Sequence, residues 1–529
     1  MNLPGSLLRR GHLDPGGGGG RLAVVRARTL AVGAWACSVL LVGLVAATPG
    51  SPFSPRLPPG AGPAGPLRWA SEALGLVRLG PSALAAVGVA AVALAAGAFA
   101  LVLRSSWRGE LTARTVFVLA ASAHVLVVLG LPLLFSRDVY SYAAYGRIAA
   151  TYHANPYLAT PADFPGDPSF AYVGPKWADT PAVYGPLWTQ ISAGVTRLVG
   201  DLPGQVAAFR ILAGAASLAT LAVVGHLARR LAPERRAFAL AAFGLNPVVL
   251  FQSVGSGHND LLVALAVAGA LALALAGWRV GATAALALGA LVKAPAAVPL
   301  ALAVVAVGAS APRGRRLRAL APHVGVAVGL GLALAAPFLS RRDPTLGMLE
   351  LATHEGWLAP SRLARRALDA ISGGALGVVP RVLFPLVFLW AVVTIGRSLV
   401  RRGVGEVREE GAAWAWGLVA LMLLGPVLLP WYVAWALPLA WLLPRAPRAV
   451  LLGTGLALAL SQWTSEPARF AAAYGANVWF GHYVLTPAVA ILLGWMLVDL
   501  GRRARSGTPL GDPPPAEGAR EVPAPAAEG

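Results

Sequence analysis

The segment from Ser136 to Trp188 holds the residues best suited to chemistry. It reads SRDVYSYAAYGRIAATYHANPYLATPADFPGDPSFAYVGPKWADTPAVYGPLW and is the longest polar, aromatic-rich interruption in an otherwise nearly apolar chain. Because it directly follows the apolar run Thr115–Phe135, Asp138 is expected at a membrane surface. A carboxylate there can accept a proton from an attacking hydroxyl, as a general base does. We therefore predict that Asp138 is catalytic; the alternative is a helix N-cap or an ion pair with Arg137.

Three tyrosines follow Asp138 closely and are predicted to bind substrate, together with Arg137. Tyr142 and Tyr145 stand three residues apart, so they line one face of an amphipathic helix that Tyr140 opens. A passive connector would be richer in Gly, Ser and Pro.

Further along, Lys176 and Tyr184 lie where this loop returns to the bilayer. They are predicted to contact substrate, or alternatively to form an interfacial belt of aromatic rings and a snorkelling lysine. Asp163 and Asp167, in ADFPGDP, are more typical of turns than of ligands.

A second polar group, His258, Asn259 and Asp260, opens an apolar helix after Gly255 and Gly257. One Asn or Asp would suffice as a helix cap. Three adjacent polar residues indicate instead the wall of a polar pocket, although the cap stays an alternative.

Lys293 separates two apolar segments that are each too short to cross a bilayer, so we expect it near the outer end of a helical hairpin. It is a candidate, with Arg137 and Lys176, to stabilise a departing anion; the alternative is a structural snorkelling lysine. Trp431 and Tyr432 are expected on the same side and are predicted to bind substrate.

Composition indicates an integral membrane protein. The apolar fraction is 57% and the charged fraction 12%, against roughly 25% charged residues in a soluble domain. Runs rich in Ala, Leu, Val and Gly approach the ~20 residues of a spanning helix. The expected fold is an all-α polytopic bundle of about 12 to 14 transmembrane helices, with the active site on outer-face loops.

Arginines cluster in the short connections between alternate groups of spans, as the positive-inside rule describes. The formal charge of +20 is therefore interpreted as topology, and no basic run resembles a nucleic-acid surface. Three regions are predicted: cytoplasmic disordered tails over 1–26 and 506–529, and a membrane domain over 27–505 with its first large outer loop at 136–204. The single cysteine, Cys37, lies in the first span and excludes an intrachain disulfide.

The sequence contains no HExxH, paired CxxC, GxxxxGK or GxSxG motif. No nucleotide-binding motif is present. If the chain is a transferase, its donor is therefore expected to arrive on a lipid.

The motifs SRDVYSYAAYGRIA, NPY and YGPLW, followed by GHND and PWYVAWALPL, resemble actinobacterial polyprenol-phosphomannose-dependent α-1,6-mannosyltransferases, which are polytopic glycosyltransferases of the GT-C class. The resemblance runs from about Leu111 to Leu500. It implies an inverting transfer from polyprenyl phosphomannose to a lipid-linked mannan on the extracytoplasmic face of the cell membrane, in lipomannan or lipoarabinomannan synthesis. The family's essential acidic residue maps onto Asp138.

Many members of the class carry two acidic residues in this loop motif, whereas here Arg137 precedes a single Asp. The sequence therefore identifies no certain cofactor and leaves a divalent metal open. Two alternatives stay open: another GT-C enzyme with a different sugar or a protein acceptor, and a lipid or sugar transporter. A transporter would place its polar residues at the bilayer midplane, whereas here they crowd one face.

Overall fold

The fold was analysed in a computed structural model, which describes residues 18–55, 57–58, 67–342, 346–347, 355–356, 358–402, 406–461 and 469–512. Within these ranges the chain is helical and has no strand. The α-helices are α1 (Gly18–Ala47), α2 (Arg68–Ala73), α3 (Pro81–Trp107), α4 (Ala113–Val125), α5 (Asp138–Ala150), α6 (Pro175–Ala178), α7 (Pro186–Leu198), α8 (Leu202–Leu231), α9 (Arg236–Gly244), α10 (Asp260–Leu275), α11 (Arg279–Val292), α12 (Ala297–Ser310), α13 (Arg316–Ala335), α15 (Pro360–Ser372), α16 (Val378–Arg402), α17 (Val407–Leu424), α18 (Arg445–Ser461), α19 (Ala471–Phe480) and α20 (Thr486–Ser506).

The all-α polytopic membrane fold predicted from composition is confirmed. Eight helical segments of the described chain are long and apolar enough to cross a membrane: Val24–Ala47, Pro81–Trp107, Ala113–Gly130, Leu202–Leu231, Pro233–Val254, Arg313–Phe338, Val378–Arg401 and Ala471–Ser506. The shorter apolar helices Asp260–Leu275, Arg279–Val292 and Ala294–Ser310 accompany them. A total of 12 to 14 spans stays a prediction.

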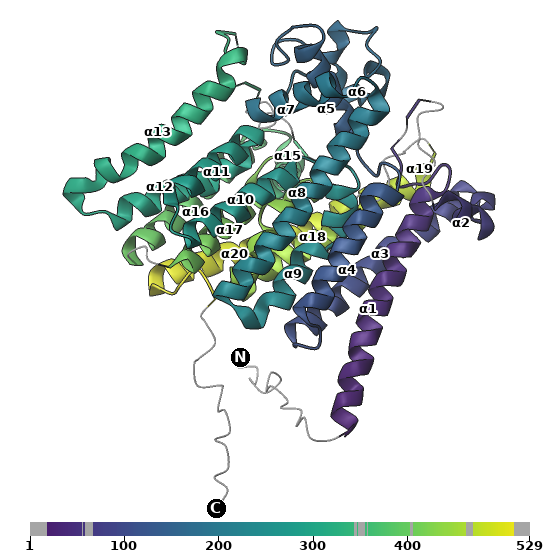
Figure 1. Cartoon of the computed structure of the whole chain (residues 1–529), viewed down its shortest axis with the longest axis horizontal. Helices are drawn as coiled ribbons and strands as arrows, with labels where there is room; N and C mark the ends of the chain where they lie inside the picture. Colours follow the sequence, from purple (N-terminus) through teal and green to yellow (C-terminus); the bar gives the residue numbers. More distant parts are fainter. Residues whose placement is uncertain are drawn as a thin grey trace, which may run out of the picture.

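Burial separates the central spans from the peripheral ones. The span Pro233–Val254 is 94% buried within the protein, whereas Arg313–Phe338 is only 11% buried. Apolar surface that other helices do not cover must face lipid in a membrane protein. In Figure 1, α13 accordingly stands at the edge of the bundle.

The predicted outer loop 136–204 is mostly helical. Helices α5 and α7 pack against each other, and with α6 they gather at one end of the molecule (Figure 1). The Gln190 side-chain amide donates to the Leu334 carbonyl at 2.6 Å, which ties α7 to the end of α13. The loop is thus a small helical layer that is fixed on the bundle.

At the opposite end, the segment that follows α20 packs back against the bundle. Leu510 is fully buried, and its backbone N–H donates to Glu409 at 2.6 Å. The Trp416 indole N–H donates to the Leu510 carbonyl at 3.0 Å. The Asp512 carboxylate pairs with Arg235 at 2.8 Å and with Arg448 at 3.2 Å. We call residues 508–512 the C-terminal clamp.

The tail boundaries differ from those expected. Helix α1 already begins at Gly18, inside the predicted tail 1–26, because the helix continues through the basic flank of its span. The C-terminal clamp lies inside the predicted tail 506–529. Residues 1–17 and 513–529 of these tails lie outside the described residues.

Candidate active site

Asp138 is the first residue of α5, and the short connector 131–137 joins it to the π-helical end of a span at Leu126–Gly130. The Ser136 hydroxyl donates to Asp138 Oδ1 at 2.9 Å and accepts the Asp138 backbone N–H at 3.1 Å. The Tyr184 hydroxyl lies 3.5 Å from Asp138 Oδ2 on the other side. The side chain keeps 19% of its surface exposed, so a substrate hydroxyl can still reach the carboxylate.

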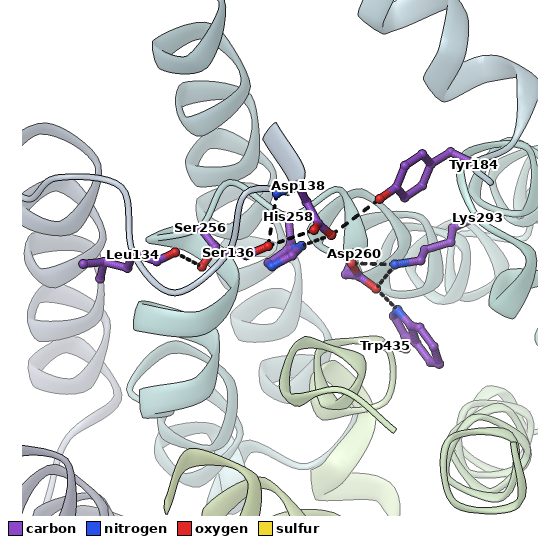
Figure 2. A network of polar contacts seen from close by, with 9 residues as sticks. All are labelled: Leu134, Ser136, Asp138, Tyr184, Ser256, His258, Asp260, Lys293 and Trp435. Atoms are coloured by element: carbon purple, nitrogen blue, oxygen red, sulfur yellow. Dashed lines mark hydrogen bonds and ion pairs between the residues drawn. The ribbon is translucent and has the colours of Figure 1, made fainter. Parts of the chain in front are cut away.

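His258 joins this carboxylate from a loop 120 residues further along the chain, between the π-helical turn Val248–Val254 and α10. Its Nδ1 lies 3.4 Å from Asp138 Oδ2. Figure 2 shows the two side chains facing each other. Its ring stacks on Trp431 with centroids 3.8 Å apart. Gly257 makes the approach possible because its φ is +71°, and an added Cβ would lie 2.7 Å from Val139.

Asn259 is fully buried, and neither end of its side-chain amide has a hydrogen-bond partner in the described chain. It occupies the N-cap position of α10 but makes no side-chain cap. Buried unpaired polar atoms are costly, so this amide is an unsatisfied polar group beside His258 in the protein interior.

Asp260 is paired with Lys293 rather than capping a helix. The Lys293 ammonium donates to both carboxylate oxygens at 2.9 Å, and the Trp435 indole N–H donates to Oδ1 at 2.6 Å. Lys293 is 7% exposed on its side chain, so it does not snorkel toward the headgroups. Trp435 was not predicted, although it follows Tyr432 by three residues and therefore lies on the same side of the 3-10 turn Pro430–Trp435.

The predicted tyrosines are buried in an aromatic layer behind Asp138. Tyr142 meets the rings of Tyr184 and Trp188 edge to face at 5.0 and 4.9 Å, and the Tyr145 hydroxyl donates to the Thr180 carbonyl. Tyr140 stacks on Tyr172, which sequence reasoning missed. These contacts are with protein, so the layer supports Tyr184 and the start of α5.

Burial also sets the protonation of the site. Burial raises the pKa of the Asp138 carboxyl above its ordinary value, against the opposing effects of the Ser136 hydroxyl and the Lys293 charge. Burial, followed by the Lys293 charge, lowers the pKa of His258 well below its ordinary value. His258 is therefore a neutral imidazole at neutral pH, and Asp138 has the raised basicity that suits a general base.

The remaining predicted residues lie apart from this cluster. Lys176 is exposed in α6, with its ammonium 5.4 Å from the Trp177 ring, and Arg137 is the half-buried residue before α5. Asp163 and Asp167 shape the loop, as their sequence context indicates. Asp163 accepts from the Thr160 backbone, and Asp167 accepts from Ser169 and pairs with Arg147 at 2.6 Å.

No group of three or more His, Cys, Asp or Glu side chains is arranged to hold a metal ion within the described ranges. The site that the structure assembles is one carboxylate with a neutral imidazole, a phenol and a serine hydroxyl around it, and a lysine–aspartate pair behind.

Comparison with known proteins adds the family. A family model described as alpha-(1->6)-mannopyranosyltransferase, N-terminal domain, matches residues 28–309, which include the cluster from Asp138 to Lys293. Alpha-(1->6)-mannopyranosyltransferase A from Mycobacterium tuberculosis is 27% identical over 386 residues, which cover 70% of this chain and 72% of that protein. Its Corynebacterium glutamicum counterpart is 34% identical over 180 residues, or 32% of this chain and 36% of that protein. Alpha-(1->6)-mannopyranosyltransferase B from the same organism is 32% identical over 134 residues, or 25% of this chain and 22% of that protein.

Proposed function

This chain belongs to the alpha-(1->6)-mannopyranosyltransferase family and is a multi-pass membrane mannosyltransferase, and we propose that it moves mannose from polyprenyl phosphomannose to a lipid-linked α-1,6-mannan. The observation that carries the proposal is the Asp138 carboxylate, which is partly open and begins the helix that follows the span Ala113–Gly130. A lipid-borne donor presents its sugar phosphate at that depth. The family match over residues 28–309 contains Ser136, Asp138, Tyr184, His258, Asp260 and Lys293.

The reaction is a single displacement. The acceptor hydroxyl attacks the anomeric carbon while Asp138 takes its proton, and the bond from that carbon to the phosphate oxygen breaks. Polyprenyl phosphate leaves with the bonding electrons, so a β-linked donor yields an α product. Phosphate is a good leaving group and needs charge stabilisation rather than protonation.

Two of the predicted cations remain candidates for that stabilisation. Arg137 precedes the base directly, and Lys176 is exposed on the same loop. Lys293 is already paired with Asp260.

We also propose on which side of the membrane the site lies. Arg235, Arg408 and Arg448 meet at Asp512 on one side of the molecule, and the span Ala113–Gly130 leads from that side toward Asp138. The positive-inside rule assigns the arginine-rich side to the cytoplasm, so we propose that the site faces the extracytoplasmic side, where nucleotide sugars do not reach.

A donor assay tests the proposal. Membranes containing the protein receive radiolabelled polyprenyl phosphomannose or, separately, radiolabelled GDP-mannose while synthesis of the lipid carrier is blocked. We expect mannan labelling from the lipid donor only. Labelling from GDP-mannose alone, with the block verified, would contradict the proposed donor. Mass spectrometry of lipoglycans from a deletion strain tests the acceptor, and we expect a shortened α-1,6-mannan.

A further inference from the structure

The Lys293 ammonium is enclosed by three aromatic rings and one carboxylate. It lies 5.1 Å from the ring centroid of Tyr432, 5.8 Å from that of Tyr184 and 5.9 Å from that of Trp435. Asp260 is fully buried and holds the ammonium with both oxygens at 2.9 Å. A cation over several ring faces is attracted by each of them. We call these five residues the lysine cage.

Four chain segments that are far apart in sequence meet in the lysine cage. Tyr184 lies in the loop 136–204 just before α7, Asp260 begins α10, Lys293 follows α11, and Tyr432 and Trp435 share one 3-10 turn. Figure 2 shows the Lys293, Asp260 and Trp435 side chains converging beside Tyr184. The lysine cage is therefore the place where the outer loop is attached to the bundle.

The backbone fixes the Tyr184 side of the cage independently. The Gly185 N–H donates to the Val292 carbonyl at 3.0 Å, next to Lys293. A Cβ on Gly185 would collide with the Leu291 carbonyl. The Tyr184 ring is thereby held against the Lys293 ammonium, while its hydroxyl lies 3.5 Å from Asp138 Oδ2.

The buried pair makes direct phosphate binding by Lys293 expensive. If Lys293 moved to a ligand, the Asp260 carboxylate would stay behind in a site with no exposed surface. Removing one partner of a buried ion pair leaves an uncompensated charge, whereas removing both is often tolerated. The pair is thus suited to hold structure in place rather than to be exchanged during turnover.

We propose that Lys293 is a positioning residue whose caged ammonium holds the Tyr184 ring so that its hydroxyl stays on the Asp138 carboxylate. The role rests on the proposed function of Asp138 as the base. In this proposal the lysine–aspartate pair attaches the loop 136–204 to the bundle and thereby orients the Asp138 carboxylate toward the acceptor.

Two double-mutant cycles test this. The first combines Lys293→Met with Tyr184→Phe, which keeps the ring and removes the hydroxyl, and measures transfer from polyprenyl phosphomannose. We expect Lys293→Met alone to lower turnover about tenfold or more, with the donor KM changed less than about threefold. In the Tyr184→Phe background the same substitution should cost much less, because coupled residues are not additive.

The second cycle combines Lys293→Met with Asp260→Asn and follows the unfolding temperature of the full chain in detergent, without any donor. Each single variant should unfold at a lower temperature, and the double variant should lose clearly less than the sum. Arg279→Met is the matched control, because it breaks the Arg279–Glu410 pair, whose carboxylate is also buried. It should lower the unfolding temperature while turnover of the folded protein stays near normal.

A tenfold rise in donor KM for Lys293→Met, with turnover unchanged and losses that multiply with those of Tyr184→Phe, would overturn the proposal in favour of donor binding. Strictly additive unfolding losses in the second cycle would overturn the cage itself. Near-normal transfer by Asp138→Asn would instead reject the base, and the unfolding cycle would still decide the cage.

Discussion

Burial and hydrogen bonding act in opposite directions on the proton of the Asp138 carboxyl, and a third contact fixes its surroundings. Burial favours the neutral acid and raises its pKa, whereas the Ser136 hydroxyl stabilises the carboxylate. His258, stacked on Trp431, brings a neutral ring nitrogen to 3.4 Å. The carboxylate is therefore more basic than an exposed one and is held in one direction, which is what a general base needs.

Asp138→Asn keeps the shape of the side chain and removes the base. We expect turnover to fall by roughly two to four orders of magnitude, while membrane insertion and the unfolding temperature stay close to those of the natural chain. Asp163→Asn is the control, because Asp163 is an exposed carboxylate of the same loop. Radiolabelled transfer in membranes measures both, and near-normal activity of Asp138→Asn would remove Asp138 from the mechanism.

The pH dependence should follow the raised pKa of Asp138. The base must be deprotonated, so transfer should fall as pH decreases through that pKa. Ser136→Ala removes a hydroxyl that holds this pKa down, so the acid limb of the pH–rate profile should move to higher pH. Ser256→Ala is the control, since that hydroxyl donates to the Leu134 carbonyl instead. An acid limb that moves down, or moves equally in both variants, would contradict this assignment.

The raised pKa of Asp138 also makes the free energy of unfolding depend on pH in a defined direction. The folded-state pKa lies above the ordinary value of about 3.9, so the folded protein binds this proton more tightly than the unfolded chain. The resulting stabilisation is complete below the unfolded pKa and is lost as pH rises through the folded pKa. The deprotonated form that the proposed base requires is therefore maintained against a cost in folding free energy.

At the scale of elements, the site depends on how the outer loop returns to the bundle. The loop leaves after one span, forms α5, and comes back through Tyr184 and Gly185 onto the end of α11. Helices α5 and α7 then pack side by side above the bundle. Tyr184 can contact both Asp138 and Lys293 only because the backbone at Gly185 lies directly against the end of α11.

Gly185→Ala should loosen that return, because its Cβ would meet the Leu291 carbonyl, a backbone atom that cannot rotate away. Overpacking of this kind costs about 1–3 kcal/mol. We expect a lower unfolding temperature and reduced transfer. Gly166→Ala, in the same loop but with open space around it, should change neither; equal behaviour of the two variants would argue against a tight return.

The sequence identifies most residues of the site but does not show which of them contact one another. Hydropathy identifies the spans, and the short motifs identify Asp138, His258 and Tyr432, because polar groups in an apolar chain are conspicuous. The contact of Asp260 with Lys293 and Trp435 is not readable, since periodicity tells which face of a helix is apolar but not which helices meet. Likewise, the tyrosines at 142 and 145 share one face as predicted, yet that face packs against protein.

At the scale of the whole molecule, charge is distributed unequally between two ends. Arg235, Arg408 and Arg448 meet Asp512 at the end opposite the outer loop. Helix α4 begins at that end, beside the connector that follows α3, and its π-helical continuation leads to Asp138. The apolar span Ala113–Gly130 therefore separates the arginine-rich face from the segment that carries the carboxylate.

This separation predicts opposite labelling of two cysteines placed in a Cys37→Ala background. Ala171 is exposed on the outer loop, and Ser506 is exposed at the end of α20. An impermeant thiol reagent should label Ala171→Cys in intact cells and Ser506→Cys only after the membrane is opened. The reverse pattern would show that the orientation is inverted.

The C-terminal clamp bears on how this protein is made. Residues 508–512 leave the ribosome after the residues that they contact, which are Glu409, Trp416 and Arg448. Those three residues are therefore synthesised and inserted before their partners exist. Until then, a carboxylate and an indole N–H in α17 lack the hydrogen bonds that they have in the finished fold. A nascent chain interrupted after α18 would expose these groups, together with the vacant site of Leu510. Quality control could thus distinguish a complete transferase from a truncated one at the arginine-rich face alone.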